Sequence, residues 1–119
     1  LLKSSWVRPG THVCAMGADT KGKQELPTDL VGNAAVYVDS IEQALSIGEC
    51  QHAFADGRLS RESIRGTLAD LVLGKAQGRR DAAEITIFDG TGVALQDLSI
   101  AKLALDRALK KDLAVSVPL

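Results

Sequence analysis

Aromatic residues are scarce in this 119-residue chain, at 3% of the sequence. With so few rings, a surface that stacks nucleic-acid bases is not expected, and the core must be built from Ala, Leu, Val and Ile. Net charge is also lacking, because 14 Lys and Arg residues oppose 15 Asp and Glu residues, for a formal charge of -1. This balance provides no electrostatic attraction to nucleic acid or to an anionic membrane, so we expect neither as a partner.

The sequence also lacks a long apolar run, an apolar leader and a cysteine framework. No apolar segment approaches the roughly 18 residues of a membrane span, and the opening LLKSSWVRPG has no signal-peptide block. Cys14 and Cys50 lie outside any CxxC, and His12 and His52 are not at zinc spacing. We therefore expect no metal site, two buried thiols and a reducing cytoplasm, with a disulfide left open as the alternative.

Short apolar runs alternate with segments of helical period along the chain. The runs predict strands at Thr11–Met16, Ala35–Val38 and Ile85–Phe88. Helices are expected over residues 27–34, from Ser40 to about 48 with a weak restart over 50–55, in two short pieces over 60–73, and over 93–111. This order predicts an α/β fold with a parallel sheet, flanking helices and a long C-terminal helix. Three strands would leave an apolar edge exposed, which suggests the second half of a larger sheet.

The loop after the first strand contains the first candidate site. It reads Gly-Ala-Asp-Thr-Lys-Gly-Lys over residues 17–23. In α/β sheets ligands bind at the carboxyl ends of the strands. Asp19 at that end, followed by glycine and by Lys23, suits proton transfer beside a bound anion or amine. The alternative is a surface loop with an Asx-turn at Asp19.

A second candidate is the glycine-containing turn between the third strand and the long helix. Gly90-Thr91-Gly92 permits close approach of a ligand to the backbone, and a helix N-terminus favours anions. The segment is not a complete dinucleotide fingerprint, so an ordinary tight turn explains it equally well. The basic residues 75–80 could hold a phosphate, but a solvated loop is the better interpretation.

Two blocks together carry a family resemblance. GAD-x-x-GK-x-EL over residues 17–26 and GTGVALQDL over 90–98 flank AVYVDSIEQAL, in that order. Over about residues 6–111 the chain resembles the ornithine cyclodeaminase/mu-crystallin family. That family includes ornithine cyclodeaminase, alanine dehydrogenase of the archaeal type, and reductases of cyclic imines and ketimines. The resemblance implies a Rossmann-type domain, NAD or NADP as cofactor, and a small L-amino acid or its imine as substrate.

The resemblance also implies roles for individual residues. Asp19 corresponds to the catalytic carboxylate, which moves a proton beside the nicotinamide and the reacting carbon–nitrogen centre. Lys23 corresponds to a residue near the substrate or to a support for the loop. Thr91, Gly92 and Val93 correspond to the turn that approaches the nicotinamide.

Departures from the family pattern shape the remaining expectations. A complete member has about three times this much chain, and no GxGxxG occurs here. We therefore expect residues 1–119 to be the C-terminal portion of a Rossmann-type NAD(P)-binding domain, without the substrate domain and inactive alone. Its partners would be further copies of itself or the missing half of the enzyme. Thr20, where strict cyclodeaminases prefer Cys, and Gln24 favour the dehydrogenase and imine-reductase branch. The alternative function is a non-catalytic, mu-crystallin-like binding or interaction module.

Overall fold

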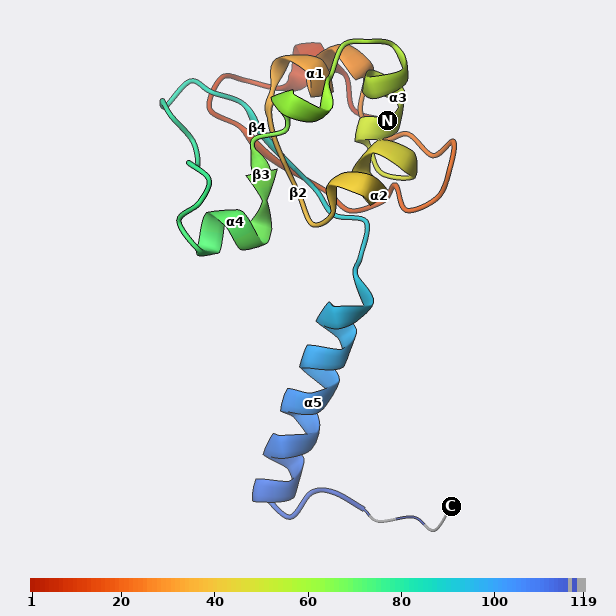
Figure 1. Cartoon of the computed structure of the whole chain (residues 1–119), viewed down its shortest axis with the longest axis vertical. Coiled ribbons are helices and arrows are strands. Elements are labelled where there is room, and N and C mark those ends of the chain that lie inside the picture. Colours follow the sequence, from red (N-terminus) through yellow and green to blue (C-terminus); the bar gives the residue numbers. More distant parts are fainter. Residues whose placement is uncertain (116, 118–119) are drawn as a thin grey trace.

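The computed structural model, which describes residues 1–115 and 117, contains a parallel four-stranded sheet (Figure 1). Its order is β1-β4-β2-β3, and the register places Ala15 and Val38 on either side of Asp89. The α/β class and the three expected strands are confirmed, one with the expected boundaries and two with boundaries shifted by one residue. The strands are β1 (His12–Ala15), β2 (Ala35–Val38), β3 (Gly66–Thr67) and β4 (Thr86–Asp89).

Three short helices form a layer on one face of this sheet (Figure 1). They are α1 (Thr28–Asn33), α2 (Ile41–Ser46) and α3 (Cys50–Ala55). The expected cap is present, because the Ser40 hydroxyl accepts the N–H of Gln43 at the start of α2. The helix that was expected only weakly after residue 48 is formed as α3.

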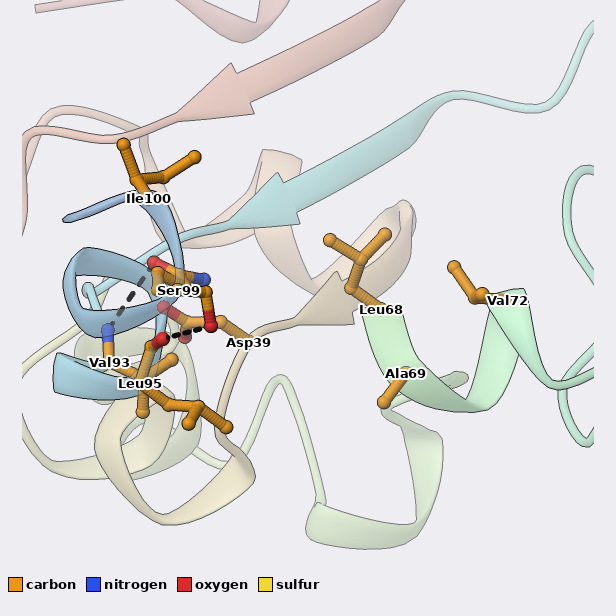
Figure 2. Close-up of a pocket in the computed structure, with 9 residues that line it drawn as sticks. Asp39, Leu68, Ala69, Val72, Val93, Leu95, Ser99 and Ile100 are labelled. Atoms are coloured by element: carbon orange, nitrogen blue, oxygen red, sulfur yellow. Dashed lines mark hydrogen bonds between the residues drawn. The ribbon is translucent and has the colours of Figure 1, made fainter. Parts of the chain in front are cut away.

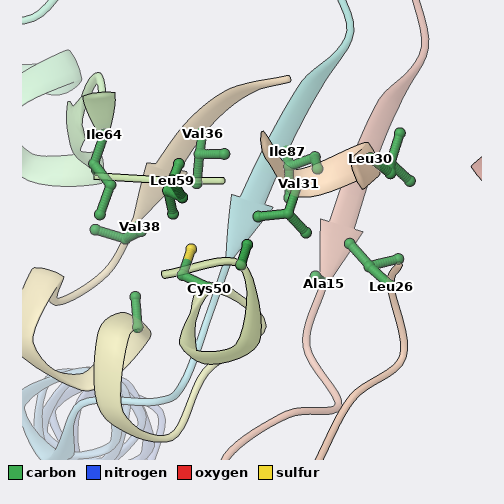
Figure 3. Packing of buried hydrophobic residues seen from close by; sticks show 12 residues of the cluster. Ala15, Leu26, Leu30, Val31, Val36, Val38, Cys50, Leu59, Ile64 and Ile87 are labelled. Carbon is green, nitrogen blue, oxygen red and sulfur yellow. The ribbon is translucent and has the colours of Figure 1, made fainter. Parts of the chain in front are cut away.

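The core lies between the sheet and this helical layer (Figure 3). Alternate strand residues point to the same face of a sheet, so Val36, Val38 and Ile87 face the helices together and are fully buried. Their helical partners include Leu30, Val31, Ala44, Cys50 and Ala53. The core is therefore aliphatic, as the shortage of aromatic residues requires.

Residues 60–73 differ from the expectation of two helical pieces. The 3-10 turn η2 (Arg61–Ser63) and the helix α4 (Leu68–Val72) are present, but β3 separates them. Gly66 pairs with Tyr37 of β2 and has a φ of +149°, which residues with a side chain rarely adopt. A two-residue strand has no periodicity, so its pairing with β2, rather than a local pattern, decides its conformation.

β1 is much less buried than its apolar sequence predicted. Only Ala15 of its four residues is buried, while His12 and Cys14 are exposed. β1 stands at the edge of the sheet and pairs with β4 on one side. His12 is held there by a 2.7 Å hydrogen bond between its Nδ1 and the Thr86 hydroxyl.

The long helix α5 (Ala94–Lys110) forms as expected but does not pack on the sheet. Figure 1 shows it extending away from the other elements, and none of its residues is buried. Its exposed apolar side chains are Leu95, Leu98, Ile100, Leu103, Leu105 and Leu109. Along residues 1–115 and 117, no helix has both the length and the apolar character needed to cross a membrane.

Candidate functional site

Three loops begin at one edge of the sheet, because parallel strands end there in register. The Gly90 N–H donates to the Ala15 carbonyl at 2.9 Å, and the Asp39 N–H donates to the Asp89 carbonyl at 3.3 Å. A Cβ on Gly90 would lie 2.6 Å from the sulfur of Met16. Absence of a side chain at Gly90 therefore lets the turn after β4 lie against the loop after β1.

Asp19 and Lys23 form an ion pair in the loop after β1. The Lys23 Nζ lies 2.5 Å from Asp19 Oδ1, and the Thr20 hydroxyl donates to the same oxygen at 3.1 Å. Both charged side chains are about half exposed, at 53% for Asp19 and 52% for Lys23. An ion pair this open to water adds little to stability. The pair instead presents a carboxylate and an ammonium to solvent at the strand edge.

The contacts around Asp19 also set its protonation state. The hydrogen bond from Lys23, then that from Thr20, and then the positive charge of Lys23 lower the pKa of the Asp19 carboxyl. Asp19 is therefore an anion at neutral pH. It is suited to accepting a proton or to stabilising a cation, and not to donating a proton.

Two side chains at the start of the neighbouring helix α3 hold this loop by its backbone. Glu49, immediately before α3, accepts the N–H groups of Glu25 and Leu26 at 2.8 and 2.9 Å. Gln51 accepts the N–H of Gly22 at 2.8 Å. Sequence reasoning missed both, because Glu49 and Gln51 read as ordinary helix residues whose partners lie more than 20 positions away.

The second predicted site, the turn after β4, is hydrogen-bonded to Asp39, the residue directly after β2. Asp39 Oδ2 accepts the Gly92 N–H at 2.7 Å, and Oδ1 accepts the Ser40 N–H at 2.8 Å. The Thr91 hydroxyl lies 2.9 Å from both Asp39 Oδ1 and Gln43 Oε1. Gly92 has a φ of +84°, and the space where a Cβ would stand has no atom within 4 Å. Asp39, which sequence reasoning also missed, thus shapes a turn whose backbone is open to a ligand.

A groove of about 610 Å³ adjoins this turn (Figure 2). Asp39 lies between its two walls, which come from α4 and from the start of α5. The predicted residue Val93 is in the second wall. The lining is mostly apolar and comprises Leu68, Ala69, Val72, Val93, Leu95, Gln96, Ser99 and Ile100 with Asp39.

Beneath the loops lie two buried acidic residues, Asp89 and Glu49, that the sequence did not reveal. Asp89 is 0% exposed; its Oδ2 accepts the Cys50 N–H at 3.1 Å, and its Oδ1 has no partner in the described residues. Burial raises the pKa of the Asp89 carboxyl and of the Glu49 carboxyl. Burial likewise raises the pKa of the Cys50 thiol. Cys50 is buried as expected, whereas Cys14 is exposed, and neither forms a disulfide.

The structure thus brings Asp19 together with Lys23, and Thr91 with Gly92, at one edge of the sheet. The other polar candidates contact backbone or side-chain groups of the fold. His52 contacts the Lys23 carbonyl through Nε2 at 3.2 Å. Arg79 of the basic segment bonds the Thr86 hydroxyl at 3.1 Å. In residues 1–115 and 117, no cluster of three or more His, Cys, Asp or Glu side chains could hold a metal ion.

Comparison with known proteins decides the family. The sequence profile of the ornithine cyclodeaminase/mu-crystallin family matches residues 1–112. The chain belongs to this family. The resemblance carried by the GAD-x-x-GK-x-EL and GTGVALQDL blocks is thereby confirmed.

Similar members of the family are enzymes of amino-acid and imine chemistry. The iminosuccinate reductase of Paracoccus denitrificans is 51% identical over 117 residues, which are 98% of this chain and 36% of that protein. Its crystal structure with NAD⁺ has a TM-score of 0.88 and 49% identity, over 95% of this chain and 34% of that one. An archaeal alanine dehydrogenase dimer with bound NAD has a TM-score of 0.92 and 39% identity, over 100% of this chain and 37% of that one.

A third structure shows a cofactor and an amino acid together. The Δ¹-pyrroline-2-carboxylate reductase of Thermococcus litoralis, in complex with NADH and L-proline, has a TM-score of 0.91 and 32% identity, over 98% of this chain and 36% of that one. The chain therefore spans about a third of the length of the relatives it matches.

Proposed function

We propose that the complete polypeptide carrying this chain is an NAD-dependent oxidoreductase that interconverts a small L-amino acid and its imine. The observation that carries the proposal is the Asp19–Lys23 ion pair in the loop after β1, at the same edge of the sheet as the open turn at Gly92 after the neighbouring strand β4. This is the edge of an α/β sheet at which ligands bind. Similarity to iminosuccinate reductase and alanine dehydrogenase supports this chemistry.

The residues of this chain fit one end of the cofactor. Gly92 leaves room for a flat ring to approach the backbone, because no atom lies within 4 Å of its missing Cβ. The neighbouring Val93 lines the apolar groove. We assign Thr91, Gly92 and Val93 to contacts with the nicotinamide. When bound, NAD(H) supplies or accepts the hydride at the substrate carbon.

Asp19 would act on the substrate nitrogen. As an anion at neutral pH, its carboxylate stabilises the positive charge of the protonated imine, the form that accepts hydride most readily. In the oxidative direction the same carboxylate accepts the proton that an ammonium substrate must lose before hydride leaves its carbon. Lys23 keeps Asp19 ionised and offers a positive charge to the substrate's carboxylate.

The proposed substrate class is the imine of a small 2-oxo acid, with iminosuccinate as the first candidate. The support is the 51% identity to a reductase of that name. Thr20 and Gln24, already noted in the GAD block, favour this branch over cyclodeaminases. An ammonia-lyase reaction is the alternative that product analysis would detect.

We infer that residues 1–119 are the C-terminal portion of a Rossmann-type NAD-binding domain. The pyrophosphate-binding turn and the substrate domain would then come from the rest of the polypeptide, in a homo-oligomer like the archaeal dimer. Two cysteines that do not pair with each other support a location in the cytoplasm.

The experiment replaces Asp19 by Asn in the complete polypeptide and follows NADH oxidation at 340 nm. Iminosuccinate, formed from oxaloacetate and ammonium, is tested beside pyruvate with ammonium and Δ¹-pyrroline-2-carboxylate. Positioned acid–base groups contribute about 10²- to 10⁴-fold, so kcat should fall by that factor while the Kd for NADH stays unchanged. Asp56→Asn, an exposed aspartate after α3, is the matched control. Retention of more than about a third of kcat in Asp19→Asn refutes the role.

Absence of turnover with all three imines, together with NADH binding by the wild-type polypeptide, would instead favour the non-catalytic binding module. Ammonia release from L-ornithine would favour the cyclodeaminase branch. These outcomes separate the proposed reaction from the alternatives.

A further inference from the structure

The loop that carries Asp19 and Lys23 has no regular secondary structure of its own. Between the end of β1 at Ala15 and the start of α1 at Thr28, no residue belongs to a helix or strand. One internal backbone bond, from the Lys23 N–H to the Thr20 carbonyl at 3.1 Å, closes a turn within it. Such a segment keeps one conformation only if other elements satisfy its backbone groups.

Glu49, immediately before α3, and Gln51, within α3, satisfy four of those groups. The two carboxylate oxygens of Glu49 each accept one backbone N–H, from Glu25 and Leu26. The Gln51 amide uses both its ends: Oε1 accepts the Gly22 N–H, and Nε2 donates to the Lys23 carbonyl at 3.2 Å and to the Gly48 carbonyl at 2.9 Å. Four backbone groups over residues 22–26 are thus held by two side chains.

The burial of Glu49 is costly, and no ion pair among residues 1–115 and 117 offsets it. Glu49 is 1% exposed. Among the described residues no Lys, Arg or His nitrogen forms an ion pair with it. Burying an unpaired carboxylate is strongly unfavourable unless hydrogen bonds compensate. A carboxyl group kept in such a place indicates a function beyond filling space, since an apolar side chain would stabilise the same volume better.

The start of α3, where these side chains lie, is itself hydrogen-bonded to the edge of the sheet. Asp89, the last residue of β4, accepts the Cys50 N–H at the start of α3. A Cβ on Gly48 would lie 2.6 Å from an Asp89 oxygen, so the helix start and the strand end are in close contact. A continuous set of contacts therefore runs from β4 through α3 to the backbone at Lys23, four residues after Asp19.

We propose that Glu49 and Gln51 are positioning residues for the reaction: they fix the backbone of residues 22–26 so that Lys23 stays paired with Asp19 and the carboxylate faces the substrate nitrogen. This inference rests on the proposed function of Asp19. Neither side chain touches the substrate, and both act through the loop. Displacement of a reacting group by about 1 Å costs on the order of 100-fold in rate.

The kinetic test is a double-mutant cycle in the complete polypeptide, with NADH and the imine that gives the highest turnover. Glu49→Gln keeps the shape but turns one acceptor oxygen into a donor that faces a backbone N–H. We expect kcat to fall 10- to 100-fold in the wild-type background and less than threefold in the Asp19→Asn background. The matched control is Glu62→Gln, an exposed glutamate in η2, which leaves kcat unchanged in both. An equal loss in both backgrounds overturns the proposal.

Hydrogen exchange gives a second readout that does not depend on activity. In Glu49→Gln the amides of Glu25 and Leu26 should exchange at least tenfold faster, while the core amide of Ile87 keeps its protection. Unchanged exchange at both loop amides overturns the proposal even if Asp19 is catalytic. If Asp19→Asn retains kcat but these amides are released, the proposed role of Asp19 fails and the holding of the loop by Glu49 stands.

Gln51→Met provides the second variant, for the case in which Glu49→Gln does not fold. Methionine has a similar length and removes all hydrogen bonds from the amide. We expect a three- to 30-fold loss of kcat, faster exchange at Gly22 and unchanged NADH binding. Wild-type kcat in Gln51→Met, with exchange at Gly22 unchanged, contradicts the proposed positioning.

Discussion

Replacement of Asp39 by Asn tests how the turn after β4 is held. Asn keeps the oxygen that faces Ser40 and Thr91 but places an N–H₂ group opposite the Gly92 N–H, which Asp39 accepts at 2.7 Å. A hydrogen bond to a charged group contributes about 1.5–3 kcal/mol, and the lower figure applies here because Gly92 is exposed. Weakening of the two retained bonds by loss of the charge adds about 0.5 kcal/mol. The expected destabilisation is therefore about 2 kcal/mol.

Urea unfolding of the chain, followed by far-ultraviolet circular dichroism, measures this difference. With an m-value of about 2 kcal/mol/M, the midpoint should fall by about 1 M. Thr91→Val, which removes one hydroxyl bond, should cost about 1 kcal/mol. The double variant should lose less than the sum of the two, because both act on one network. The exposed-site control is Asp56→Asn. If the free energy of unfolding of Asp39→Asn lies within about 0.5 kcal/mol of that of the wild type and of this control, the reasoning is refuted.

Two further predictions concern the buried groups under the site. Burial raises the pKa of the Asp89 carboxyl in the folded chain. The favourable contribution of this carboxyl to the free energy of unfolding is therefore complete below its pKa in the unfolded chain, about 3.9. That contribution is lost as pH rises through its pKa in the folded chain. The free energy of unfolding of the wild type minus that of Asp89→Asn should therefore increase as pH falls from 7 towards 4; a constant or decreasing difference contradicts this. Cys14 is exposed and Cys50 is buried with a raised thiol pKa, so a native-state thiol titration with Ellman's reagent should detect one fast-reacting thiol per chain, which Cys14→Ser abolishes, whereas two fast thiols contradict the burial of Cys50.

The sequence predicted those parts of the fold that are decided locally. β2 is a run of four apolar residues, all buried, and Ser40 caps the next helix as its position indicated. β3 escaped prediction because two residues contain no pattern and its partner Tyr37 lies 29 positions earlier. β1 was expected to be buried because its residues are apolar, yet burial depends on how many strands flank it, which composition does not encode.

The same distinction applies to the candidate site. Asp19 and Lys23 could be predicted because they follow a strand directly and lie in a block shared with a known family. Asp39 and Glu49 could not, since each is a single carboxylate next to a helix start, where acidic residues are common. The one available signal for Glu49 is its place between Gly48 and Cys50, an interruption of the apolar helix pattern.

The exposed helix α5 has a thermodynamic consequence for the turn that precedes it. Its 17 residues amount to about 25 Å of helix and none of them is buried, so α5 lacks the tertiary packing that gives most protein helices their stability. Its coil–helix equilibrium is therefore close to balance, and any surface that covers its leucines will shift that equilibrium strongly. Because α5 begins at Ala94, two residues after Gly92, ordering its first turn restricts the same backbone that Asp39 holds. Binding of a surface to the apolar side chains of α5 and binding of a ligand at the turn are thus linked. Each event should raise the affinity of the other by the same factor.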